Sequence, residues 1–62
     1  MSYELLTERQ AAASLNCSVA LLRKWRLLSI GPTYLKIGRL VRYKEADLKE
    51  FLEANRVERR VS

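Results

Sequence analysis

The sequence has no histidine and a single cysteine, Cys17, among its 62 residues. A disulfide within the chain is therefore impossible, and a zinc site lacks its usual ligands. Without histidine, the chain also lacks an imidazole for acid–base or triad chemistry. With only two glycines, it has no glycine-rich loop to cradle a phosphate. We therefore expect no enzyme, no metal and no cofactor.

Long apolar runs are missing as well. No segment approaches the roughly 20 apolar residues that cross a bilayer, and the N-terminus lacks the pattern of a secretory signal. We expect a protein of the cytoplasm, in a bacterium or a phage-infected cell, with no membrane partner. A chain of this length forms one domain with a small core and little room for a deep catalytic cleft.

Acidic residues are absent from the whole middle of the chain. Twelve Lys and Arg stand against seven Asp and Glu, and the net charge is +5. All seven acids lie outside the span from Arg9 to Lys44. A small domain with such a positive block is expected to bind a polyanion or an acidic surface. The bases of this block are Arg9, Arg23, Lys24, Arg26, Lys36, Arg39, Arg42 and Lys44.

A capping signal opens the first predicted helix. Thr7 and Gln10 have the spacing of a capping box, in which each side chain binds the backbone N–H of the other. Glu8 lies in the first turn, where the helix dipole favours a carboxylate. We expect a helix over residues 8–15, ended by Asn16 in the left-handed conformation. Its buried stripe is Ala11, Ala12 and Leu15.

A second helix follows after a very short turn. Ser18 is a favourable N-cap, and we expect a helix over residues 19–28. Two helices joined this closely form a helix-turn-helix motif. Leu21, Leu22 and Trp25 fall on the core side of the helical wheel. The outer side carries bases and no acid, which is typical of a helix that enters a nucleic-acid groove. These bases are Arg23, Lys24 and Arg26.

A short hairpin is predicted next. Gly31 and Pro32 stop the second helix. Residues 34–43 then alternate, with β-branched or aromatic side chains at several positions, around a turn at Gly38 and Arg39. The tip of this hairpin is basic.

One more helix completes the predicted domain. We expect it over residues 45–55, and residues 1–6 are expected as a lead-in to the first helix. The fold class is mostly α with a small β-hairpin, in one domain over residues 1–55. Residues 56–62 are expected to form a flexible basic tail. The buried stripe of the last helix is Leu48, Phe51 and Leu52.

Three stretches together carry a resemblance to a known family. The matching positions are Leu6, Thr7, Ala11, Ala12, Leu15, Ser18, Leu22 and Trp25, then the run 36–43, then Asp47, Leu48, Phe51 and Leu52. Over about residues 5–57, the chain resembles the excisionase and MerR-like superfamily of winged helix-turn-helix proteins. The hairpin corresponds to the wing of that superfamily.

The resemblance implies a small DNA-binding protein of a phage or plasmid, such as a recombination directionality factor or an AlpA-like regulator. In such proteins the second helix enters the major groove, and the wing touches the adjacent minor groove or backbone. Implied partners are double-stranded DNA, an integrase or recombinase, and further copies of the chain on adjacent sites. The candidate contacts are Ser18, Val19, Ala20, Arg23, Lys24 and Arg26 on the helix and Lys36, Arg39 and Arg42 on the wing.

The second helix departs from the family pattern where it begins. Family members usually begin this helix with polar residues, whereas this chain has Val19, Ala20 and Leu21. Hydrogen bonds to base edges then depend on Arg23 and Lys24, with Ser18 as a further candidate. Val19 or Ala20 would contact thymine methyl groups. The sequence therefore predicts DNA affinity more firmly than it predicts sequence specificity.

Some of these residues also have a purely structural interpretation. Arg26 could lie along the edge of the core, and Arg42 could protect a sheet edge by its charge. Aromatic residues could stack on single-stranded bases, but Trp25 and Phe51 fall on apolar stripes and are expected in the core. Cys17 is expected to act as a small buried hydrophobe.

Three other functions are compatible with the same pattern. A transcriptional regulator or a phage packaging subunit could use the same winged domain. A protein-interaction module of a different class could bind an acidic partner through the apolar start of the second helix and through Leu27.

Overall fold

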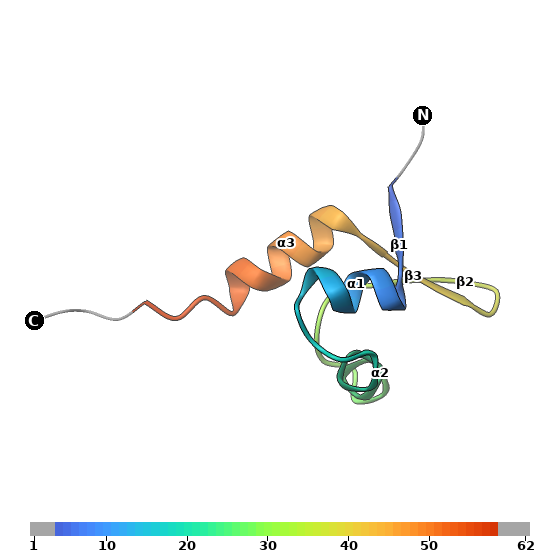
Figure 1. Ribbon diagram of the computed structural model, residues 1–62, viewed down its shortest axis with the longest axis horizontal. Coiled ribbons are helices and arrows are strands. Elements are labelled where there is room, and N and C mark those ends of the chain that lie inside the picture. Colours follow the sequence, from blue (N-terminus) through green and yellow to red (C-terminus); the bar gives the residue numbers. More distant parts are fainter. Residues whose placement is uncertain (1–3, 59–62) are drawn as a thin grey trace, which may run out of the picture.

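The computed structural model describes residues 4–58 of the chain. In chain order, the elements are β1 (Leu5–Thr7), α1 (Glu8–Ser14), α2 (Val19–Leu27), β2 (Leu35–Ile37), β3 (Leu40–Lys44) and α3 (Glu45–Ala54). Figure 1 shows α2 nearly end-on below α1, while α3 and the β2–β3 turn extend in opposite directions from this centre. The last part of the expected basic tail, residues 59–62, lies outside the described residues and includes Arg59 and Arg60.

The predicted capping signals of the helix-turn-helix are confirmed. The backbone nitrogen of Gln10 donates to Thr7 Oγ1 at 3.1 Å, and that of Thr7 donates to Gln10 Oε1 at 2.9 Å. Asn16 has a φ of 55° and ends α1 in the left-handed conformation. Ser18 Oγ then accepts the backbone N–H of Leu21 at 3.0 Å and begins α2. Short polar caps thus fix both ends of the turn between the two helices.

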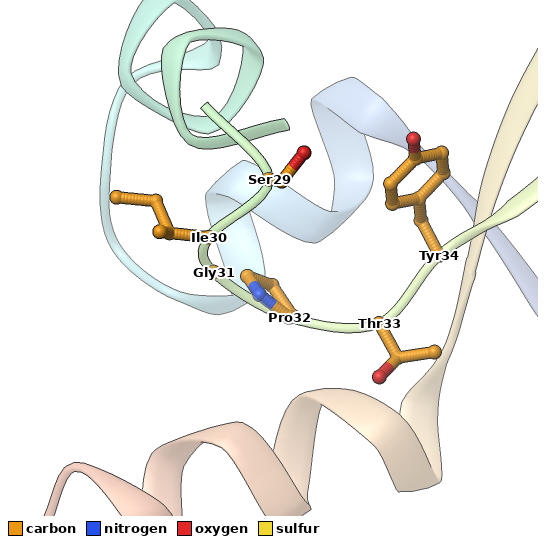
Figure 2. A pocket seen from close by; sticks show the side chains of 6 residues that line it. All are labelled: Ser29, Ile30, Gly31, Pro32, Thr33 and Tyr34. Carbon is orange, nitrogen blue, oxygen red and sulfur yellow. The ribbon is translucent and has the colours of Figure 1, made fainter. Parts of the chain in front are cut away.

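The end of α2 differs in detail from the expectation. Ser29, rather than Gly31, is the first left-handed residue, with a φ of 58°. The backbone nitrogens of Ile30 and Ser29 donate to Trp25 O at 2.9 Å and Arg26 O at 3.2 Å, which is a Schellman motif. Figure 2 shows the loop that follows, from Ser29 to Tyr34. The helix thus ends within one residue of the predicted position, although a serine and not a glycine takes the left-handed conformation.

Gly31 is the second left-handed residue of this loop, with a φ of 88°. An added Cβ would lie 2.9 Å from Cβ of Trp25. We expect Gly31→Ala to lower the free energy of unfolding by about 2–3 kcal/mol, because backbone strain adds to overpacking. Gly38→Ala is the matched control, since Gly38 has a φ of 60° but nothing within 4 Å of such a Cβ. Its cost should be only about 1 kcal/mol, and equal losses in urea denaturation would contradict this account.

The sheet has three antiparallel strands in the order β1-β3-β2. The hairpin was expected, with Leu35 opposite Arg42 and Ile37 opposite Leu40. The third strand was not expected, because residues 1–6 were predicted only as a lead-in. Strand β1 pairs with β3 and places Leu6 opposite Tyr43. A three-residue strand whose partner lies far along the chain leaves no local pattern in the sequence. This strand ties the start of α1 to the base of the wing.

The core is small and joins all three helices to the sheet. Its buried members are Ala11, Ala12, Leu22, Tyr43 and Leu48. The alanines let α2 approach α1 closely, as expected, and Cys17 is partly buried against the same cluster. The ring centroids of Trp25 and Phe51 lie 5.6 Å apart, so both side chains pack at the edge of the core. Leu52 departs from its predicted stripe, because half of its surface is exposed. Leu21, expected on the core side of α2, is also exposed.

Candidate nucleic-acid interface

Leu22 is buried on the inner face of α2, and this burial orients the helix so that its opposite face points to solvent. Arg23 is 64% exposed, and the side chain of Lys24 is exposed beside it. Ser18 and Ala20 are exposed near the N-terminal end of the helix. The predicted contact residue Val19 is different, because it is half-buried and packs against the core. Its apolar surface is therefore largely used within the protein.

Glu8 of α1 corrects the prediction that no acid shares the basic face of α2. Its Oε1 lies 3.1 Å from Arg23 Nε, and its Oε2 lies 3.0 Å from Arg26 Nε. The hydroxyl of Tyr43 donates to the same Oε2 at 3.4 Å. One carboxylate thus contacts two of the predicted DNA-binding arginines. The prediction failed because it counted acids within the helix and not on the neighbouring helix.

The charges around Glu8 favour the ionised carboxylate. Burial by itself raises the pKa of Glu8, but the hydrogen bonds and positive charges of Arg26 and Arg23 outweigh it and lower the pKa below its ordinary value. The pKa of Tyr43 is raised, first by burial and then by the nearby charge of Glu8. The tyrosine therefore keeps its proton and can donate to the carboxylate.

Arg26 lies at the edge of the core, in agreement with its structural interpretation. Its side chain is 21% exposed, and its guanidinium carbon lies 5.9 Å from the ring centroid of Tyr34. The ring centroid of Tyr34 lies 6.2 Å from that of Tyr43. Arg26 is thus held between an aromatic ring and Glu8, and it offers less surface to a ligand than Arg23 does.

The wing presents its predicted bases at different levels of exposure. Arg39 lies in the turn between β2 and β3 and is exposed, as is Lys36 in β2. Arg42 is half-buried, and its Nη1 donates to Val41 O at 2.7 Å. Arg39 at the tip is therefore the most accessible arginine of the wing.

A shallow depression connects α2 with the wing. Its lining comes from α1, α2, the turn and β3: Glu8, Arg23, Arg26, Arg39, Leu40, Val41 and Arg42. Four of these seven residues are arginines, and Glu8 is the one acid among them. The predicted helix and wing arginines are therefore brought to one side of the molecule, where a polyanion could contact both.

The sequence contains one signal for the missed role of Glu8. Arg23 and Arg26 are three residues apart and share one side of α2. Glu8 is the last acid before the positive block and opens the helix that packs against α2. The three-residue spacing is compatible with one carboxylate that contacts both arginines. Only the packing of α1 on α2 shows that this carboxylate belongs to Glu8.

A membrane-spanning helix and a metal-binding cluster are both absent from the described residues. Over residues 4–58, no helix is long and apolar enough to cross a membrane. In the same part of the chain, His, Cys, Asp and Glu do not gather into a group that could hold a metal ion.

The arrangement defines a class of protein. A helix-turn-helix whose second helix is basic, followed by a basic hairpin wing, is a winged helix-turn-helix. A family model described as a helix-turn-helix domain matches residues 5–56. The chain therefore belongs to this helix-turn-helix family and is a DNA-binding domain. A search of curated proteins gave no match.

Proposed function

We propose that the chain binds double-stranded DNA with α2 in the major groove and the wing on the adjacent minor groove or backbone. The observation that supports this mode most strongly is the shared depression, which brings Arg23 of α2 and Arg39 of the wing to one side. Exposed Lys24 and Lys36 add positive charge on these two elements. Arginine and lysine side chains on phosphates would fix the position of the protein, while α2 contacts base edges.

We further propose that the biological role is that of an excisionase-type recombination directionality factor. The positive block and the wing resemble that family, and one module of this size buries little DNA surface. Useful affinity then depends on further copies on adjacent sites or on an integrase. The exposed apolar side chains of Leu27, Leu28 and Ile30 offer a surface for such a protein contact. The protein would act without catalysis, in the cytoplasm, with residues 1–55 as the binding domain.

The test of this role is an excision assay in the native genetic context. Removal of the gene for this chain should abolish the excised junction of the surrounding element, measured by quantitative PCR. Resupply of the wild-type chain should restore it, whereas an Arg23→Ala/Lys24→Ala/Arg39→Ala variant should not. Unchanged excision without the chain would contradict the role.

A transcriptional regulator of the same fold is the alternative within the class. It would leave excision unchanged and alter transcription of a neighbouring operon. An integrase gene beside this one would favour excision, whereas a divergent promoter would favour regulation.

A further inference from the structure

Glu8 is an acid at the centre of a surface that otherwise attracts anions. It lines the depression between α2 and the wing together with four arginines. Its side chain is only 14% exposed, and its carboxylate contacts Arg23, Arg26 and Tyr43. A carboxylate at this place weakens the attraction to phosphate. Simple DNA affinity therefore does not explain why it is there.

The position of Glu8 is rigidly held. It follows Thr7, the N-cap of α1, which is also the last residue of β1. The hydroxyl that donates to it belongs to Tyr43, which is buried in the core. Glu8 therefore joins α1, α2 and β3 at one point and provides a fixed acceptor for the arginines of α2.

The contacts with Glu8 leave part of Arg23 available to a ligand. The hydrogen bond and ion pair of Arg23 with Glu8 run through Nε. Within residues 4–58, no further partner binds its terminal Nη groups, and the side chain is 64% exposed. An arginine with Nε anchored has fewer rotamers to lose when its terminal nitrogens meet a planar acceptor pair such as the O6 and N7 of guanine.

The same contacts reduce the charge that α2 presents. One carboxylate stands against two guanidinium groups, so the cluster carries one net positive charge instead of two. Sequence-independent binding depends on the number of phosphates that the protein neutralises. Glu8 thus lowers attraction to any duplex while it orients Arg23 for a matching one.

We propose that Glu8 is a specificity-determining positioning residue, which aligns Arg23 and Arg26 and suppresses binding to non-cognate DNA. This inference rests on the proposed DNA-binding mode. It concerns base recognition, and the melting temperatures in the test separate this role from any contribution of Glu8 to stability, because Glu8 is not one of the apolar core residues.

The test compares Glu8→Gln with Glu50→Gln in the full chain. Glu50 is an exposed acid of α3. Both variants lose one carboxylate, so the net charge rises by one in each, but only Glu8→Gln alters the arginine cluster. Two probes are used at one salt concentration: the best duplex that the wild-type chain selects from a random pool, and a mixed-sequence duplex of equal length. Melting temperatures are recorded for each variant.

Glu8→Gln should bind the mixed-sequence duplex about fivefold more tightly, because one more positive charge faces phosphate. Its ratio of selected to mixed-sequence affinity should fall roughly tenfold, as expected for a loosened base contact. Glu50→Gln should leave that ratio unchanged.

Four outcomes would count against the account, and they are distinguishable. An unchanged ratio in Glu8→Gln would overturn the inference, as would a loss of both affinities that follows a lower melting temperature. A wild-type chain that binds duplexes without preference would overturn the inference and leave DNA binding intact. Failure of the wild-type chain to bind any duplex would overturn the proposed function itself.

Discussion

Replacing Lys24 and Arg39 together by alanine is expected to weaken binding to a mixed-sequence duplex by roughly 100-fold. Both side chains are exposed, one on α2 and one at the wing tip, and in the proposed binding mode each makes a charged hydrogen bond to phosphate. Such a bond contributes about 1.5 kcal/mol, and the sum of two corresponds to roughly two decades in the dissociation constant. The slope of log affinity against log salt should fall by about 1.8, because each neutralised phosphate contributes about 0.9 to that slope.

Lys49→Ala/Arg56→Ala is the matched control for this variant. Both side chains are exposed and lie on or just after α3, and the double substitution removes the same total charge. If α2 and the wing form the interface, the control should stay within a few-fold of the wild-type affinity. Equal losses in the two variants would mean that net charge alone drives binding, with no defined surface.

Leu22→Ala is expected to lower the free energy of unfolding by about 3–4 kcal/mol. Leu22 has no exposed surface and packs against the alanines of α1 within the core. Truncation of a buried leucine removes apolar packing and leaves a cavity that the neighbours fill only in part. Because a domain of this size has little stability in reserve, the variant should be largely unfolded near 37 °C. Thermal unfolding followed by far-ultraviolet circular dichroism measures the effect.

Leu27→Ala provides the comparison on the same helix. Leu27 is 79% exposed, and its truncation should change the free energy of unfolding by less than about 0.5 kcal/mol. Similar losses of stability in Leu22→Ala and Leu27→Ala would show that α2 does not turn Leu22 toward the core and Leu27 toward solvent.

Local signals in the sequence predicted the parts of the fold that depend on neighbouring residues. The capping box of Thr7 and Gln10, the left-handed Asn16 and the N-cap Ser18 lie within a few positions of their partners. The hairpin around Gly38 was predictable for the same reason, because its two strands directly flank the turn in the sequence. These features placed both helices of the motif and the wing to within one or two residues.

The features that were missed depend on residues far apart in the chain. Strand β1 exists because Leu6 finds Tyr43 opposite it, and neither residue alone marks a strand there. Glu8 meets Arg23 and Arg26 only after α1 packs on α2. The sequence pattern identified the candidate bases, whereas the acid that links two of them required the tertiary structure.

The most direct test of the interface is chemical-shift mapping of the labelled chain with a double-stranded DNA. If α2 and the wing contact DNA, amides of residues 18–28 and 36–42 should shift together and saturate at one stoichiometry. Amides of α3 should move little, because this helix lies away from the β2–β3 turn (Figure 1). Shifts confined to α3, or to Leu27, Leu28 and Ile30 without the wing, would contradict the account.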